Sequence, residues 1–475
     1  MPFREQNRLL YFFKPIIMVF DMMEDSMTIR SDALAADFAP LRGKRVLIAL
    51  SGGADSVALA AMLADARKEY GLTLFAAHVD HAIRPESAAD AAFCKALCAR
   101  LDIPLHAVRV DVPAEAERSG EGLESAARRL RYEALRRIQG EVRADAIALA
   151  HHMDDQAETV LMHLARGAGP EGIGGMRAVS GDLYRPLLGL RKAELVEYLR
   201  VRGLPWREDA TNRVPDTPRN ALRLHGIPEL EKCYPQFVRA AARYAQSAQI
   251  ESDLVADLTR SYLDRASASG PFHAWLDVSD PPHPAVLRRA LRAMCRRDVD
   301  FEQIGALEAL CGAAKGKLDL GFCCAERAGR RLYFVPKRLP EIAPAELALD
   351  GVTRLPGIGS VRAAPCEPVP IREDPFRQAL SADALQGAVL RTRRPGDRVR
   401  PLGCGDKLLS DWFIDRKVDR PLRDVTALVA RGSRVLWVVG GCIAEEAKLT
   451  GRERAICLEY TPETIPYNGG NCHGE

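Results

Sequence analysis

One short turn constrains the fold of this chain more than any other feature. Residues 51–56 read SGGADS, directly after the apolar run 45–50 (RVLIAL) and before the helical stretch 57–70. The apolar run has the composition of a strand that is buried on both faces. Two glycines allow positive φ and leave no Cβ in the way, so backbone N–H groups can point at an anion. The N-terminus of the following helix adds partial positive charge at the same place.

We interpret this turn as a phosphate-binding loop, and its place after a buried first strand favours that over a plain glycine turn. It lacks the Lys-Ser/Thr ending of a Walker A loop, and it carries Asp55 among the phosphates. A carboxylate there would repel phosphate unless a divalent metal lies between them. Asp55 is therefore expected to contact Mg²⁺ or to orient the group that is activated.

Strands and helices alternate from Lys44 to about Leu222, which predicts an α/β fold with a parallel sheet and helices on both faces. Ligands of such sheets lie at the carboxyl ends of the strands, so the loops after strands one, two and four are the places to look for chemistry. The further strands are expected at 72–79, 105–112 and 146–150, with helices at 86–101, 123–138 and 154–165.

The length of 475 residues suggests two to four domains. Besides a catalytic domain at 43–224, we expect a mostly helical domain at 225–345. A proline-rich linker at 346–388 and a small α+β domain at 389–462 would follow, with a tail at 463–475.

Residues 1–42 form an extension that we expect to be disordered or to lie before the true start. The apolar run 9–20 within it is interrupted by Lys14 and Pro15, and is too short to cross a bilayer at about 20 residues. A membrane-surface segment is the alternative. Twelve cysteines without a C-x-x-C pair argue against zinc ribbons and redox pairs. Such scattered thiols favour a cytoplasmic protein.

Three acids open the helix after the fourth strand, namely Asp154, Asp155 and Glu158. Residues three and four apart share a helix face, so these carboxylates can stand together. Acids are favoured at any helix N-terminus, but that preference explains one acid better than a cluster. The cluster suits a cationic amine or Mg²⁺. His151 and His152, just before it, are interpreted as packed or capping residues.

Basic residues concentrate outside the catalytic domain, although the formal net charge of the whole chain is only +3. Residues 391–434 hold twelve Lys or Arg against six Asp, with Trp412 and Phe413 among them, and the helix expected at 285–297 carries five arginines. Solvated surface is the ordinary reading of such runs, but two of them favour contacts with a nucleic-acid backbone. The predicted RNA-binding residues are Arg288, Arg289, Arg394, Arg398, Lys407, Arg416 and Lys417.

SGGADS resembles the S-G-G-x-D-S signature of the PP-loop, or N-type, ATP pyrophosphatases. Further motifs together resemble the tRNA(Ile)-lysidine synthetase family, over nearly the whole chain after residue 43. Thr211 departs from the serine common at its position but keeps the hydroxyl. These motifs are 78–84 (HVDHAIR), 124–132 (ESAARRLRY), 150–159 (AHHMDDQAET), 185–188 (RPLL), 209–212 (DATN), 219–223 (RNALR), 393–398 (RRPGDR) and 411–418 (DWFIDRKV).

The resemblance implies an adenine nucleotide alpha hydrolase-like fold and a carbon–nitrogen ligase that uses ATP and Mg²⁺. The enzyme would adenylate carbon-2 oxygen of the wobble cytidine of tRNA(Ile) with a CAU anticodon, and the amine of free L-lysine would displace AMP. The lysidine formed would pair with A instead of G. Neither a membrane nor an obligate protein partner is expected.

Residue roles follow from the same resemblance. Catalytic roles fall on Asp55, Asp154, Asp155, Glu158 and Arg128, with Asp55 and Asp155 as metal ligands. Paired arginines on one helix face, here Arg128 and Arg131, are otherwise read as a solvated surface. The nucleotide would be bound by Ser51, Gly52, Gly53, Ala54, Asp55, Ser56, His78 and His81.

Three rival functions remain at this level. A tRNA 2-thiolating PP-loop enzyme would normally need catalytic cysteines, often as C-x-x-C. An ammonia-dependent PP-loop synthetase would not need two appended basic segments. A tRNA-binding protein without catalysis would have little reason to keep both SGGADS and the three acids.

Overall fold

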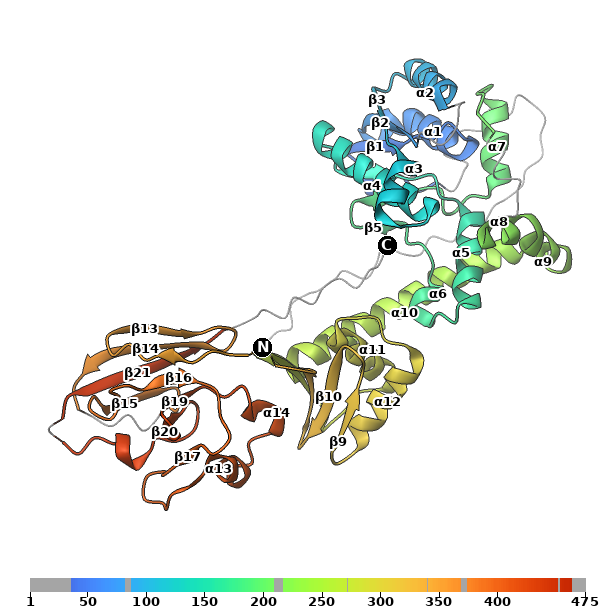
Figure 1. Ribbon diagram of the computed structural model, residues 1–475. Coiled ribbons are helices and arrows are strands. Elements are labelled where there is room, and N and C mark those ends of the chain that lie inside the picture. Colours follow the sequence, from blue (N-terminus) through green and yellow to red (C-terminus); the bar gives the residue numbers. More distant parts are fainter. Residues whose placement is uncertain are drawn as a thin grey trace, which may run out of the picture. The chain divides into compact units, whose positions relative to one another are not determined.

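The computed structural model describes residues 36–81, 87–208, 217–270, 272–339, 341–368, 374–451 and 453–463 (Figure 1). The chain divides into two compact units, Met1–Ser252 and Asp253–Glu475. Most of the predicted N-terminal extension lies outside the described residues, as do nearly all of the tail and the motif at 209–212. No helix within the described ranges is long and apolar enough to cross a membrane.

The first unit is built on a six-stranded sheet with the order β3-β2-β1-β4-β6-β5, which is parallel except for the β5–β6 pair. Its strands are β1 (Arg45–Ala49), β2 (Thr73–Asp80), β3 (Leu105–Arg109), β4 (Ala146–Ala148), β5 (Val179–Ser180) and β6 (Leu183–Tyr184). Its helices include α1 (Ala54–Tyr70), α2 (Ser87–Leu101), α3 (Val112–Ser119), α4 (Leu123–Val142), α5 (Met153–Ala165), α6 (Pro170–Ile173), α7 (Lys192–Val201), α8 (Pro218–Ala221), the π-helical turn η4 (Leu222–Gly226) and α9 (Ile227–Cys233).

The central strand β1 shows why helices cover both faces of this sheet. Successive side chains of a strand point to opposite faces. Val46 and Ile48 accordingly pack in a core with residues of α1, α2 and α7. Leu47 and Ala49 pack in a second core with residues of α4. The predicted parallel sheet with helices on both faces is confirmed.

The second unit contains a five-stranded antiparallel sheet beside its helices, and the prediction of a mostly helical segment at 225–345 did not include this sheet. Its strands contain small and polar residues such as SASG, which have weak strand propensity, and pairing within the sheet overrides that preference. The strand order is β7-β8-β11-β10-β9. The elements are α10 (Phe237–Ala266), β7 (Ser267–Gly270), β8 (His273–Asp277), α11 (Pro284–Cys295), α12 (Phe301–Gly312), β9 (Gly316–Asp319), β10 (Cys323–Ala328) and β11 (Arg331–Pro336).

The segment 346–388 was predicted as a linker, and the structure contradicts this. β14 and β15 pair with the last strand, β21, and Val361, Ala363 and Leu380 are buried in a shared core. Proline-rich composition concealed the alternation of buried and exposed residues along β14. The strands are β12 (Ala345–Glu346), β13 (Gly351–Leu355), β14 (Gly359–Cys366), β15 (Arg377–Ser381), β16 (Val389–Arg391), β17 (Arg398–Val399), β18 (Lys407–Leu408), β19 (Leu428–Arg431), β20 (Arg434–Val438) and β21 (Ala455–Pro462).

The remaining strands of this region form a six-stranded sheet with the order β12-β16-β19-β20-β17-β18. Two short helices, α13 (Leu409–Asp415) and α14 (Arg420–Arg423), lie in the connections. α13 buries Trp412 and Phe413 in a core with strand residues such as Val399 and Leu428. These aromatic side chains are therefore packing residues and not part of a basic surface.

Candidate active site

The loop after β1 is held by one buried serine. The Ser56 hydroxyl accepts hydrogen bonds from the backbone N–H of Ser51 (3.2 Å) and Gly52 (3.1 Å) and donates to the carbonyl of Gly53 (3.0 Å). Gly52 has φ +89°, the left-handed region that glycine adopts without strain. Ser56 thus shapes the loop from within, whereas the sequence suggested a hydroxyl that contacts phosphate.

The approach to the loop is open at its second glycine. Among the residues that the structure describes, a Cβ on Gly53 would meet only Ser51 Oγ, at 3.7 Å, and none of their side chains caps the N-terminus of α1. The first N–H groups of a helix have no intrahelical partner, and they carry its positive dipole end. An oxyanion can therefore be bound here by backbone groups alone.

Asp55, in the first turn of α1, has one carboxylate oxygen available for a ligand. Its Oδ1 is buried without a hydrogen-bond partner among the described residues, while Oδ2 lies 3.7 Å from both His152 Nε2 and Lys192 Nζ. Burial alone would raise the pKa of Asp55, but the hydrogen bond and charge of His152, then the charges of Lys192 and Arg223, lower it below its ordinary value. The carboxylate form is the one that can hold a cation.

His152 is the N-cap residue of α5, which is one of its predicted roles, and it also lies among the carboxylates of the acid cluster. It is 2% exposed, and its ring nitrogens lie 3.5–3.7 Å from carboxylate oxygens of Asp55, Asp154 and Asp155. Burial disfavours the imidazolium, but these carboxylates outweigh it and raise the pKa of His152 to about 9. Its Nδ1 lies 3.5 Å from Asp154 Oδ2 and 3.4 Å from the backbone nitrogen of Asp155.

Asp154 anchors the start of α7. Its Oδ1 accepts from Arg191 Nε at 3.0 Å and its Oδ2 from the Lys192 backbone N–H at 2.8 Å. Burial raises the pKa of Asp154, but His152, Arg191 and the Lys192 amide together hold it well below its ordinary range. Both oxygens of this carboxylate are engaged.

Asp155 and Glu158 stand together on α5, as their spacing predicted, but two arginines occupy them. Glu158 is 1% exposed, and its two oxygens accept from Arg219 Nε at 2.7 Å and Arg223 Nε at 2.6 Å. Asp155 Oδ1 accepts from Arg223 Nη2 at 3.0 Å, and its Oδ2 accepts from the His152 backbone N–H at 3.1 Å. The cluster is thus a network of paired charges and not an open anionic hole.

The two histidines predicted at the nucleotide site differ in orientation. His78 is buried, and its Nδ1 donates to the Leu50 carbonyl at 2.9 Å, so this side chain braces the end of the first strand. His81 Nδ1 is buried without a hydrogen-bond partner in the described part of the chain. Burial, and then the charge of Arg131, lowers the pKa of His81 and keeps the ring neutral.

The charge of Arg131 on α4 acts on His81 and on His151. Burial, followed by the charges of Arg185 and Arg131, lowers the pKa of His151 to about 3 against the opposing charge of Asp155. Arg128 is exposed, with its guanidinium 5.4 Å from the centre of the Tyr132 ring. A catalytic role for Arg128 stays a prediction.

The predicted RNA-binding residues of the second unit divide into paired and exposed groups. Arg288 bonds Glu308, Arg398 bonds Asp406 and Lys407 bonds Asp415, each at 2.7–2.8 Å. Arg289 also has an interaction partner. The exposed members of the set are Arg394, Arg416 and Lys417.

The parallel sheet of the first unit and the phosphate-binding loop after β1 together define the class of protein to which the chain belongs. A family model of the PP-loop domain matches residues 24–230, and a model described as the TilS substrate C-terminal domain matches residues 388–460. The chain is therefore a PP-loop enzyme that uses ATP and carries an appended substrate domain. This agrees with the loop geometry at the N-terminus of α1.

Relatives that match over most of their length narrow the class to a family. The tRNA(Ile)-lysidine synthase of Symbiobacterium thermophilum is 36% identical over 439 residues, which cover 84% of this chain and 90% of the relative. That of Caldanaerobacter subterraneus subsp. tengcongensis is 30% identical over 439 residues, covering 88% and 94%. One from Thermus thermophilus is 35% identical over 398 residues, covering 83% and 68%. The chain belongs to the tRNA(Ile)-lysidine synthase family.

Several residues of this site were not predicted. No role was assigned to Arg191, Lys192, Arg219 or Arg223. His152 was predicted as a capping or packed residue, and it is the buried N-cap of α5, but its contacts with three carboxylates were not predicted. Arg219 and Arg223 stand inside a motif noted in the sequence, and their spacing of four puts both on one helix face. This spacing of two arginines was the one feature of the sequence that could have indicated a partner for the acid cluster.

Proposed function

We propose that this chain ligates free L-lysine to carbon-2 of the wobble cytidine of tRNA(Ile) with a CAU anticodon, and so forms lysidine. The observation that carries the proposal is the meeting of an open PP-loop with a charged cluster around Asp55, on a chain of this family. The cytidine would exchange an oxygen for an amine, and its pairing would change from G to A.

In the first step, carbon-2 oxygen of the cytidine attacks the α-phosphate of ATP and pyrophosphate leaves. The backbone N–H groups at the start of α1 would bind the phosphates, with Ser56 holding the loop in shape. Preorganised donors of this kind stabilise the charge that develops on phosphoryl oxygens.

Mg²⁺ fits the residues at Asp55. The buried Oδ1 without a partner is an oxygen ligand, and Mg²⁺ prefers one or two carboxylates together with substrate phosphates. No cluster of three or more His, Cys, Asp or Glu that could hold a metal occurs in the described ranges, which agrees with such a shared site. Mg²⁺ would neutralise phosphate charge there. Asp155 fits less well, since Arg223 and the His152 amide engage its two oxygens.

In the second step, the lysine amine attacks carbon-2 and AMP leaves, with loss of the amine's proton. Lys192 marks the place for that amine. Its side chain is 45% exposed, and its Nζ already lies 3.7 Å from Asp55 Oδ2. The ammonium of a free lysine would take the place of the Lys192 ammonium beside Asp55. Because Lys192 is already partly exposed, its displacement would bring no buried charge to the surface.

The test is a ligation assay with purified protein, ATP, Mg²⁺, the cognate tRNA and radiolabelled lysine. We expect label in the RNA and one AMP and one pyrophosphate formed for each lysine. The matched pair of variants is Asp55→Asn and Glu141→Gln, the latter an acid on α4 that is 57% exposed. Only Asp55→Asn should stop incorporation. No labelled RNA, with sulfur or ammonia incorporated instead, would refute the proposed function.

A further inference from the structure

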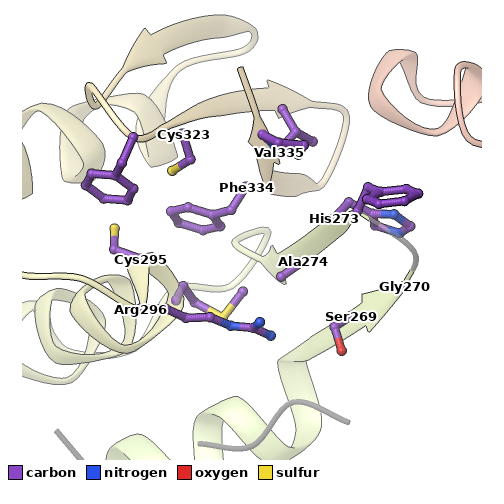
Figure 2. Close-up of a pocket in the computed structure, with 13 residues that line it drawn as sticks. Ser269, Gly270, His273, Ala274, Cys295, Arg296, Cys323, Phe334 and Val335 are labelled. Carbon is purple, nitrogen blue, oxygen red and sulfur yellow. The ribbon is translucent and has the colours of Figure 1, made fainter. Parts of the chain in front are cut away.

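A pocket of about 310 Å³ opens in the first sheet of the second unit, and its lining includes none of the residues assigned above (Figure 2). Strands β7, β8, β10 and β11 and the C-terminal end of α11 surround it. The volume is in the range of small-molecule sites. Its lining falls into an apolar set and a polar set, and each set has a clear chemical preference.

The apolar set is dominated by aromatic rings and sulfur. Phe334 is buried on β11, Phe322 is half-buried just before β10, and Phe272 is half-buried between β7 and β8. Met294 and Cys295 close the pocket from the end of α11. Flat aromatic faces and polarisable sulfur are good surfaces for stacking a planar ring.

The two thiols of the lining do not provide another function. Burial raises the pKa of Cys295 to about 12 and that of Cys323 to about 11. Both are therefore neutral near pH 7, whereas nucleophilic attack and metal binding need the thiolate. They act as apolar walls of the pocket.

The polar set is cationic at one end. Arg296 is exposed and extends from the end of α11 toward Ser269 of β7 in Figure 2. The next residue, Arg297, is also exposed, and its guanidinium lies 5.7 Å from the centre of the Phe322 ring. Two guanidinium groups beside a stacking surface match a planar ring that is joined to a phosphodiester.

We propose that this pocket receives a single unstacked nucleobase of the RNA substrate, with Arg296 and Arg297 on the adjoining phosphates. This inference rests on the proposed function only in that RNA is the substrate. RNA bases that are splayed out of a helix are bound by stacking on Phe rings and on guanidinium planes, and this lining offers both. Such a pocket would fix the RNA on the second unit at a nucleotide other than the cytidine that reacts.

The experiment is base-by-base chemical probing of the cognate tRNA bound to the full chain, with dimethyl sulfate for A and C and a carbodiimide for G and U. The test variant is Phe322→Ala, and the control is Phe376→Ala, a ring of the same unit that is 49% exposed and outside the pocket. We expect one base that is protected by the parent and by the control but reactive with Phe322→Ala, with an affinity loss of roughly tenfold.

A second variant keeps the test decisive if Phe322→Ala fails to fold. Arg296 has φ +55° at the end of α11, so Arg296→Gly removes the cation at a position where glycine is the residue with least strain. It should weaken binding and reduce the slope of log K against log salt by about one. Identical protection patterns for the parent and both variants would overturn the pocket assignment.

The probing needs only bound RNA, so its outcome is separate from that of the ligation assay. Lysine incorporation with an unchanged protection pattern would refute the pocket and leave the proposed function standing. A protected base that depends on Phe322, with no lysine incorporated, would support the pocket and refute the proposed function.

Discussion

The charge of His152 can be tested by its effect on stability as the pH changes. Its pKa is about 9 in the folded protein against an ordinary 6.5, a difference worth about 3 kcal/mol. Because the folded pKa is raised, this stabilisation is fully present below pH 6.5. It is lost as the pH rises through about 9.

The assay compares thermal unfolding of the parent and of His152→Gln at pH 6 and pH 9.5, following the first unit. The glutamine variant loses the packing of the imidazole at both pH values. The informative quantity is therefore the difference in melting temperature between parent and variant, and how it changes from pH 6 to pH 9.5. In a unit of about 250 residues, 3 kcal/mol corresponds to roughly 6–12 °C in melting temperature. The advantage of the parent should shrink by that amount at pH 9.5. His106→Gln, on β3 and outside the acid cluster, is the matched control and should show no such change. An equal parent-to-variant difference at both pH values would refute the reasoning.

Four further substitutions have defined outcomes. Asp55→Asn should lower kcat about 100-fold or more in the ligation assay at saturating ATP, since it removes a ligand for charge in the reacting complex. Gly52→Ala places a side chain at φ +89°, a strain of about 1–2 kcal/mol, and should weaken ATP binding roughly tenfold by calorimetry. Asp397→Asn leaves Arg391 buried beside a neutral partner and should lower the free energy of unfolding of the second unit by about 3 kcal/mol in urea titrations, whereas an unchanged midpoint would contradict a stabilising pair. Arg416→Ala should weaken RNA binding at about 150 mM salt, and an unaltered salt slope would remove it from the RNA surface.

The features that could be predicted from the sequence depend on residues that are close together along the chain. The strand, glycine turn and helix around Gly52 are contiguous, so their meeting follows from chain connectivity. The acids of α5 share a face because helix geometry places residues three and four apart together. Both predictions concern spacing over a few residues. The PP-loop architecture and the acid cluster were accordingly predicted without reference to distant contacts.

Contacts across long stretches of chain could not be predicted in the same way. Arg219 reaches Glu158 across 61 residues, and no periodicity reports such a partner. Trp412 lies in a run of basic residues, and this run suggested that Trp412 is at the surface. In the structure it is on the apolar side of α13 and is buried in a core. The strands at 346–388 gain their stability from pairing with β21, far along the chain. In each case a tertiary partner decides the outcome.

The ion pairs that Arg219 and Arg223 form with the acids of α5 can also be regarded as a binding equilibrium. Arg219 and Arg223 are cations tethered to the chain, so they occupy Asp155 and Glu158 at an effective concentration in the millimolar range. A free amine that binds these carboxylates competes with the two arginines, so its concentration must be comparable with their effective concentration. Increases in ionic strength weaken the tethered and the free cation alike, so this competition depends less on salt than binding at an empty acidic site would.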